Sequence, residues 1–280
     1  MVQAVLCGIA VCYRVPYQPG VSRSVPATPV APRAGATNKN MQVALISGIV
    51  ALDDRVVVWL GQFVSKWPLF NLFVAWLIDA RIVKFLPFVL VICWFWFERT
   101  PLQELRRKIL LESVMTSLVA VFVARLLALT LRFRDRPAAN PGLHLVIPLE
   151  TGLRTWSSFP SDHAVVAFAL AASLARVSLP VGIWAFLHAL VVISLPRIYF
   201  GLHYPSDVII GALIGITLAA AIAQLRGRQV VTGLPLKLES RYPAPFYVAS
   251  FFVLFEIAEI FDSVRIFAVN VFRVLRRLVT

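Results

Sequence analysis

Long apolar runs, each bounded by charged residues or proline, constrain the fold of this chain more than any other feature. A membrane-spanning helix needs about 20 mainly apolar residues, and only helices and closed barrels satisfy their backbone polar groups inside lipid. Hydrophobic residues make up 59% of the 280 residues and charged residues 15%. We therefore predict an all-α, polytopic membrane helix bundle. The runs that we interpret as spans cover residues 83–97, 109–131, 160–175, 181–195 and 205–225.

The N-terminal part of the chain does not follow this pattern. Residues 1–40 contain closely spaced prolines and no acidic residue, which is typical of a disordered tail. We hypothesise that Met41 is the initiator and that the tail is not translated. Residues 41–81 mix apolar and charged side chains and include Trp59 and Trp67, so they are predicted to form an amphipathic helix at the membrane interface.

The two ends of the apolar region allow more than one span count. The run 83–97 reaches span length only if its helix begins near Leu77. The segment 226–280 carries charged residues within its apolar run, so it is either a sixth span or a helix at the interface, with a basic tail. We predict five or six spans, with the membrane core in residues 82–225.

The net charge is +13, and the positions of the basic residues along the chain indicate the topology. Basic residues concentrate in 98–108 and 226–241, and the positive-inside rule places such segments in the cytoplasm. The loops 132–159 and 196–204 then lie outside the cell (inner) membrane, facing the periplasm. Because the charges separate apolar runs and form no basic face, we predict no nucleic-acid partner. The three cysteines lack metal-ligand spacing, and no metal or other cofactor is predicted.

Polar motifs stand at the outer ends of four spans. Arg136-Pro137 follows the second span, and Pro160-Ser161-Asp162-His163 opens the third. Arg197 ends the fourth span, and His203 and Asp207 flank the start of the fifth. Guanidinium groups and helix N-termini both bind phosphate oxygens. These residues predict a phosphate site on one membrane face.

The motifs resemble those of the type 2 phosphatidic acid phosphatase superfamily: Lys-x6-Arg-Pro, Pro-Ser-x-His and Ser-Arg-x5-His-x3-Asp. The second motif is intact in residues 160–163, and the third has Pro196 at the serine position. The first has Leu129 at the lysine position. The resemblance covers roughly residues 80–225. The candidates for the missing cation are Arg125, Arg132 and Arg134.

The resemblance also implies a role for each motif residue. His203 attacks phosphorus and forms a phosphohistidine, and Asp207 accepts a hydrogen bond from the other ring nitrogen. His163 protonates the leaving oxygen and then activates water. The charged oxygens are stabilised by Arg136, Arg197 and Ser161.

Three other polar residues are interpreted as structural. Asp162 is expected only to place a favourable charge at a helix N-terminus. His188, in the middle of the fourth span, is expected to be packed and hydrogen-bonded, and His144 is expected to be an ordinary loop residue.

The function that the resemblance implies is metal-independent hydrolysis of a lipid phosphate or isoprenoid diphosphate, such as phosphatidic acid or undecaprenyl diphosphate. A lipid phosphotransferase is the enzymatic alternative. A non-catalytic protein that binds or transports a lipid phosphate is the alternative from another class, because Leu129 and Pro196 depart from the family pattern. The expected partners are the lipid substrate and membrane lipid, and a homo-oligomer is compatible with such a bundle.

Overall fold

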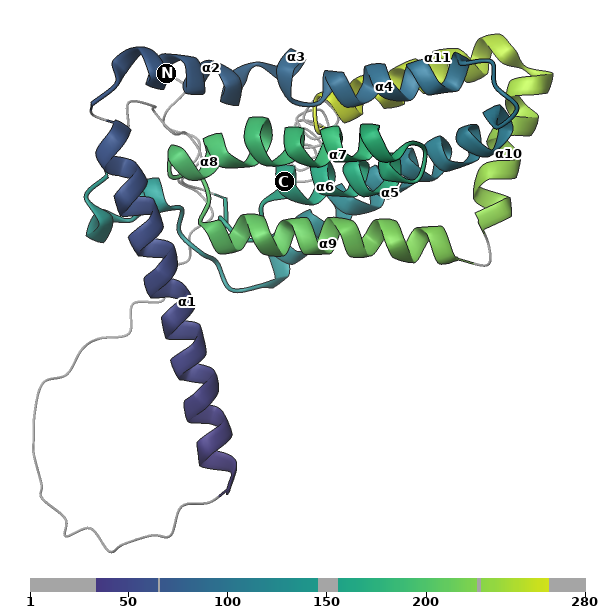
Figure 1. The fold of residues 1–280 in the computed structure, drawn as a ribbon. Coiled ribbons are helices and arrows are strands. Elements are labelled where there is room, and N and C mark those ends of the chain that lie inside the picture. The colour runs from purple at the N-terminus through teal and green to yellow at the C-terminus, as the bar shows by residue number, and fades with distance from the viewer. Residues whose placement is uncertain (1–33, 65, 146–155, 226–227, 262–280) are drawn as a thin grey trace, which may run out of the picture. The chain divides into compact units, whose positions relative to one another are not determined.

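A computed structural model describes residues 34–64, 66–145, 156–225 and 228–261 (Figure 1). Within these ranges the regular structure is entirely helical, which confirms the predicted all-α class. Internal contacts divide the chain into a unit of residues 1–44 and a unit of residues 45–280. All the polar motifs predicted from the sequence lie in the second unit. Its helices, with α1 shared between the units, are α1 (Ala34–Val64), α2 (Pro68–Asp79), α3 (Arg81–Lys84), α4 (Leu86–Phe97), α5 (Gln103–Thr130), α6 (Asp162–Ala175), α7 (Leu179–His188), α8 (Leu195–Tyr199), α9 (Pro205–Gln224), α10 (Arg228–Arg241) and α11 (Pro243–Ala258).

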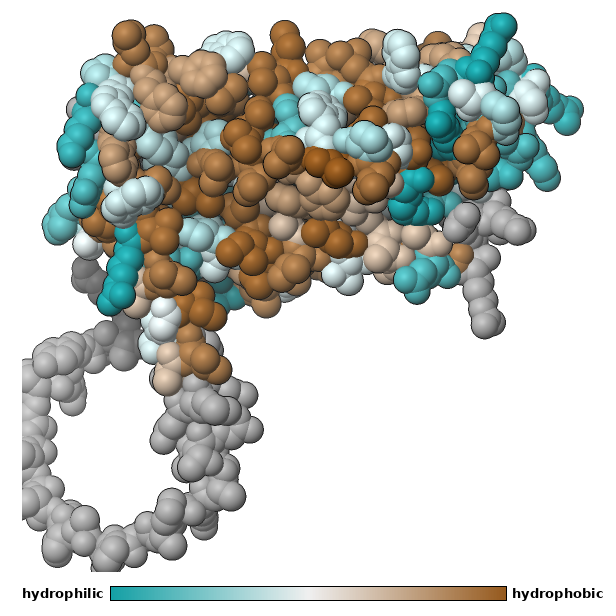
Figure 2. Space-filling model, viewed as in Figure 1, coloured by the Kyte–Doolittle hydropathy of each residue, from teal (hydrophilic) through white to brown (hydrophobic). Residues whose placement is uncertain are grey.

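In the described part of the chain, three helical segments are long and apolar enough to cross a membrane. They are α5, the continuous segment from α7 through a π-helical turn at Ala189–Ser194 to α8, and α9. Four shorter apolar helices accompany them: α2, α4, α6 and α11. Figure 2 shows apolar residues across the middle of the visible face and hydrophilic residues gathered towards its two ends. This pattern fits a membrane helix bundle, and the count of five or six spans stays a prediction.

Helix α6 lies at the centre of the bundle and packs against α5, α7 and α9 (Figure 1). Its small side chains allow close packing, and Ala167 and Ala171 are fully buried. Helix α9 approaches α6 through Gly215, where an added Cβ would lie only 2.2 Å from the carbonyl oxygen of Val165. A side chain larger than hydrogen at Gly215 would push the two helices apart. The start of α6 and the start of α9 are therefore held in a fixed relation.

The site end of the bundle is defined by where four helices stop and start. Helix α5 ends at Thr130, α6 begins at Asp162, α8 ends at Tyr199 and α9 begins at Pro205. Proline suits the first turn of a helix because its missing N–H is not needed there. In α9 the Asp207 side chain also accepts from the backbone N–H of Tyr204, which completes a capping box.

Helix α1 packs against this end of the bundle. Val57 is 1% exposed and belongs to an apolar cluster with Ile198, Tyr204 and Val208. Asp53, on the same helix, is 3% exposed. The sequence predicted an interfacial helix in this region. The structure adds that two apolar residues of this helix, Val57 and Val64, are buried in clusters with other parts of the chain.

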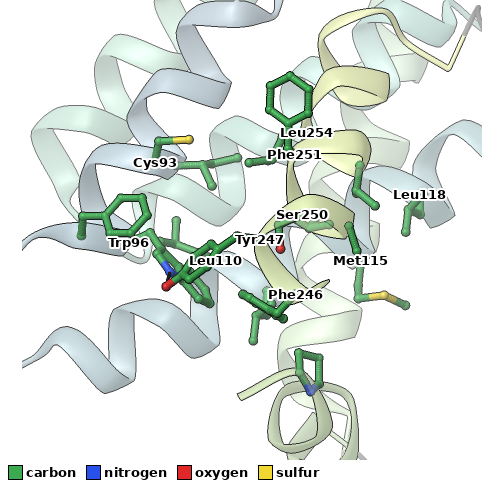
Figure 3. Close-up of a pocket in the computed structure, with 17 residues that line it drawn as sticks. Cys93, Trp96, Leu110, Met115, Leu118, Phe246, Tyr247, Ser250, Phe251 and Leu254 are labelled. Carbon is green, nitrogen blue, oxygen red and sulfur yellow. Dashed lines mark hydrogen bonds between the residues drawn. The ribbon is translucent and has the colours of Figure 1, made fainter. Parts of the chain in front are cut away.

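A large apolar cavity of about 410 Å³ opens between α4, α5, α10 and α11 (Figure 3). Its walls include Trp96, Met115, Phe246 and Leu254, and none of the described residues that line it is charged. A phosphate group would find no cation there. The site therefore has to be sought in a different cavity, further along α5.

Candidate active site

A smaller polar cavity of about 120 Å³ lies where α5 ends and α6 begins, beside the loop that leads into α9. Among the described residues, three arginines and one aspartate line it, an excess of two positive charges before the histidines are counted. Such an excess suits a phosphate dianion. The lining residues are Ala124, Arg125, Ala128, Arg136, Trp156, Ser157, Pro160, Asp162, His163, Arg197 and His203.

His203 lies in the loop before α9 and is 2% exposed. Its Nδ1 is 2.8 Å from the carbonyl oxygen of Ser158. Because a carbonyl can only accept, Nδ1 carries the hydrogen and Nε2 keeps the lone pair. Burial lowers the pKa of His203 well below its ordinary value, and the charges of Arg136 and Arg197 lower it further. The ring is therefore neutral near pH 7, as a nitrogen nucleophile must be.

Asp207 is fully buried on α9, and its Oδ2 lies 4.0 Å from Nδ1 of His203. This separation is too long for the direct hydrogen bond that the resemblance implied. Oδ2 accepts instead from the Ser158 hydroxyl and, at 2.8 Å, from the backbone N–H of Tyr204. Ser158 thus links the two residues, since its carbonyl accepts from His203 and its hydroxyl donates to Asp207.

Arg134 is held by two buried carboxylates. Its Nη1 lies 2.5 Å from Oδ1 of Asp207, and its Nη2 lies 2.7 Å from Oδ2 of Asp53. Its guanidinium also stacks 4.0 Å from the ring centre of Tyr204. Asp53 accepts a further hydrogen bond, at 3.0 Å, from the backbone N–H of Ser206 in the first turn of α9. Arg134 does not line the small cavity, so we assign it to the scaffold of the loop before α9.

His163 lies in the first turn of α6. Its Nδ1 is 2.7 Å from Oδ1 of Asp162, which also accepts from the backbone N–H of His163 at 2.8 Å. The other carboxylate oxygen, Oδ2, lies 2.8 Å from Nη2 of Arg125. The guanidinium of Arg125 is 5.4 Å from the ring centre of Trp156. Asp162 therefore contacts two cavity-lining side chains, which its interpretation as a bystander left out.

Arg136 and Arg197 supply the other two positive charges. Nη1 of Arg136 donates to the carbonyl of Leu202 at 3.0 Å, and its buried Nε has no hydrogen-bond partner within the described ranges. Arg197 is 6% exposed on α8, and its backbone carbonyl accepts from the N–H groups of Leu202 and His203. Burial lowers the pKa of Arg136. An anion in the cavity would offset the cost of burying that charge.

Ser161 precedes α6 as its N-cap residue and is fully buried. Its hydroxyl has no hydrogen-bond partner in the part of the chain that the structure describes, and the residue does not line the cavity wall. A buried hydroxyl without a partner costs free energy. The structure thus leaves this donor unused beside His163.

The remaining polar candidates lie elsewhere. Arg132 is exposed, and Leu129, at the position of the family's lysine, is 75% exposed. Nε2 of His188 lies 2.9 Å from the carbonyl of Lys84, so this histidine is packed and hydrogen-bonded as expected. His144 is exposed in its loop. Among the described residues, no group of three or more His, Cys, Asp or Glu side chains could hold a metal ion.

Sequence reasoning missed the contributions of Ser158 and Asp53 to this site. Ser158 acts through a backbone carbonyl, which no side-chain pattern reveals. Asp53 lies 81 positions before Arg134, and its only sequence signal is a charge inside an apolar helix. Asp162 did carry a signal, because a carboxylate immediately before a histidine can reach its ring.

Comparison with known proteins agrees with this geometry. Residues 109–230 match the model of the PAP2 superfamily. Every residue that lines the small cavity falls in this stretch. Over these residues the match agrees with the resemblance that the motifs carry, to the superfamily of type 2 phosphatidic acid phosphatases.

Two curated relatives are similar to this chain. The bacitracin transport permease protein BcrC of Bacillus licheniformis is 28% identical over 144 residues, which cover 51% of this chain and 66% of that protein. The lipid A 4'-phosphatase of Bacteroides thetaiotaomicron is 36% identical over 90 residues, which cover 30% of this chain and 38% of that protein. The chain thus spans less than two thirds of the length of the relatives it matches. No solved structure matches it.

Proposed function

We propose that this protein hydrolyses the phosphate or diphosphate group of a membrane lipid through a phosphohistidine intermediate. The observation that carries this proposal is the small cavity, in which two histidines with defined ring contacts lie among three arginines. Two further observations support it: the family match covers the whole cavity, and one relative is named a lipid A 4'-phosphatase.

The first step is attack on phosphorus by Nε2 of His203. The bond from Nε2 to phosphorus forms while the bond from phosphorus to the leaving oxygen breaks. His163 enters this step as an imidazolium, with Nδ1–H donated to Asp162, and the leaving oxygen takes the proton of its Nε2, which leaves the ring neutral. The phosphorylated ring of His203 keeps its Nδ1 hydrogen bond to the carbonyl of Ser158.

The second step returns the enzyme to its starting state. Nε2 of His163 now accepts a proton from water, and the water oxygen attacks phosphorus. The bond from phosphorus to Nε2 of His203 breaks, and inorganic phosphate leaves. Arg136 and Arg197, which line the cavity, are the donors that we assign to the charged oxygens in both steps. The third donor that we assign is the hydroxyl of Ser161, which precedes His163 and has no hydrogen-bond partner among the described residues. Because arginines supply this charge, we expect activity to persist in EDTA.

The position of the cavity favours a lipid substrate. It lies at the ends of helices that are long and apolar enough to span a membrane. A phosphate group at the membrane surface could enter it while the lipid chain stays in the bilayer. The positive-inside rule places this end of the bundle outside the cell (inner) membrane, facing the periplasm.

Phosphate release from purified protein in detergent tests the proposal. We would assay phosphatidic acid, undecaprenyl diphosphate and a lipid A phosphate in EDTA, with wild type and His203→Ala. Wild type should release phosphate from at least one of them, and His203→Ala should lose at least about 10³-fold in kcat. Full activity in His203→Ala would refute the nucleophile assignment.

Transport of a lipid phosphate is the second candidate, because one relative is named a transport permease. The same variant separates the two functions. A transporter should still move its lipid across vesicles when a nucleophile is removed, and wild type should release no phosphate. A phosphotransferase would instead release less phosphate when an acceptor alcohol is added, and a new phosphate ester would form.

A further inference from the structure

Asp162 joins two cavity-lining side chains from different helices. One carboxylate oxygen lies 2.7 Å from Nδ1 of His163 on α6, and the other lies 2.8 Å from Nη2 of Arg125 on α5. The side chains of Asp162 and Arg125 are 19% and 24% exposed, so the ion pair is largely shielded from water. The contacts form a continuous chain from Arg125 through Asp162 to His163.

Arg125 also accounts for one departure from the family pattern. Leu129 stands where the family has lysine, and its side chain points outward. Arg125 lies one helical turn earlier on α5 and lines the cavity. Its charge, however, is paired with Asp162 and stacked on Trp156. We therefore distinguish it from Arg136, which makes no ion pair within the described ranges and has an unused donor.

We propose that Asp162 and Arg125 act as a pair of positioning residues for His163, the general acid and base. Asp162 accepts from Nδ1 of His163 and so directs Nε2 to the substrate. Arg125 fixes the carboxylate of Asp162 and neutralises a charge that would otherwise repel phosphate. This inference rests on the proposed function and adds a pair of positioning residues that the family motifs do not contain.

The leaving group of the substrate distinguishes positioning from a purely structural role. An alkyl phosphate needs a proton on its leaving oxygen, whereas p-nitrophenyl phosphate does not. Hydrolysis of the phosphohistidine needs His163 as a base with either substrate. A variant with a misplaced His163 should therefore be phosphorylated at a near-normal rate by p-nitrophenyl phosphate, and should then turn over slowly.

The central variant is Asp162→Asn, with Asp135→Asn as the matched control at an exposed aspartate in the loop after α5. On the lipid phosphate, Asp162→Asn should lower kcat by on the order of 10²-fold with little change in KM. On p-nitrophenyl phosphate it should give a burst of about one p-nitrophenolate per enzyme, with a trappable phosphoenzyme. The control should match wild type in both assays.

Three outcomes would overturn the inference for Asp162. They are unchanged kinetics, an equal loss on both substrates without a burst, and a loss that appears only in KM. Inhibition by orthovanadate and the thermal midpoint in detergent verify that the variant is folded. If Asp162→Asn does not fold, Arg125→Gln provides the same test, because it leaves both Asp162 and His163 in place.

Arg125→Gln should give the same loss on the lipid phosphate and the same burst on p-nitrophenyl phosphate, though both smaller, and Arg125→Lys should recover part of the activity. An increase in KM alone, equal for both substrates, would identify Arg125 as a direct phosphate ligand and overturn its positioning role. The proposed function fails separately, when wild type releases no phosphate or His203→Ala is fully active. An active wild type with an indistinguishable Asp162→Asn refutes the positioning pair alone.

Discussion

The tripeptide Pro-Ser-Asp occurs twice, and the side chains of the two copies make different contacts. Residues 160–162 lead into α6, which begins at Asp162, and residues 205–207 form the start of α9, at the same end of the bundle. The carboxylate of Asp162 holds His163 and Arg125, which both line the cavity. The carboxylate of Asp207 holds Arg134, Ser158 and the backbone of Tyr204, away from the cavity wall. The same tripeptide starts a helix in both places, and the surrounding elements decide its chemistry.

The serines differ in the same way. The hydroxyl of Ser161 has no hydrogen-bond partner within the described ranges, whereas Ser206 contacts Asp53 through both its hydroxyl and its N–H group. We infer that the first copy serves catalysis and that the second serves the architecture of the loop that carries His203. Substitutions in the first copy should therefore lower mainly kcat, and substitutions in the second copy should lower mainly the free energy of unfolding.

The largest effect should come from Asp207→Ala. It leaves Arg134 with one carboxylate fewer and removes the acceptor of the buried Ser158 hydroxyl. Breaking a buried ion pair from one side costs about 3–5 kcal/mol, so we expect a loss of this size in the free energy of unfolding in detergent. Activity should fall on every substrate regardless of leaving group. A folded variant with a burst on p-nitrophenyl phosphate would show that the second copy also acts through His163.

The serines offer a matched pair for the next test. Ser161→Ala removes a hydroxyl that has no hydrogen-bond partner in the described part of the chain, so the free energy of unfolding should change by less than about 0.5 kcal/mol. Its kcat should fall by about 10²-fold if the hydroxyl donates to the transition state. Ser206→Ala should show the reverse, a loss of about 1 kcal/mol in stability and a kcat close to wild type. Equal behaviour of the two variants would contradict the division of roles.

The sequence predicted much of this arrangement, for physical reasons that can be stated. Span length and loop charge follow from the cost of burying polar groups in lipid. Helices α6 and α9 therefore begin and end close to the predicted limits, whereas α5 ends close to its predicted limit but begins earlier, at Gln103. His163, His203, Arg136 and Arg197 were found because each stands beside a helix end. Their spacing is a local property of the chain, and the structure places all four at one cavity.

The contacts between distant segments were not predictable in this way. The bond from Asp53 to Arg134 depends on how α1 packs, and an acidic residue in an amphipathic helix is ordinarily solvated. The Ser158 carbonyl belongs to the backbone, so its role has no sequence signal. The choice of Arg125 over Arg132 and Arg134 depends on which arginine the fold leaves beside the cavity. The sequence motif alone does not predict which of these arginines lies beside the cavity.

Asp53 and Asp54 test whether α1 supports the second copy. Asp53→Asn weakens the ion pair with Arg134 and the contact with the first turn of α9, and should cost about 1–2 kcal/mol in the free energy of unfolding. Asp54→Asn is the control, because Asp54 is adjacent to Asp53 in the sequence and its own side chain is only half-buried. If Asp53→Asn is as stable as wild type, α1 does not stabilise the loop that carries His203.

The smallest effect concerns the dependence of stability on pH. Burial, Arg136 and Arg197 lower the pKa of His203 below its ordinary value of 6.5, against the opposing charge of Asp162. Below pH 6.5 the unfolded chain therefore binds a proton at this ring that the folded protein does not bind. The contribution is present in full above that pH and is lost on acidification, by about 1.4 kcal/mol per pH unit. Between pH 7.5 and 5.5, His203→Gln should lose about 1.4 kcal/mol less than wild type. An identical slope in both proteins would mean that the ring takes up its proton over the same pH range in the folded and unfolded states, and would contradict the lowered pKa.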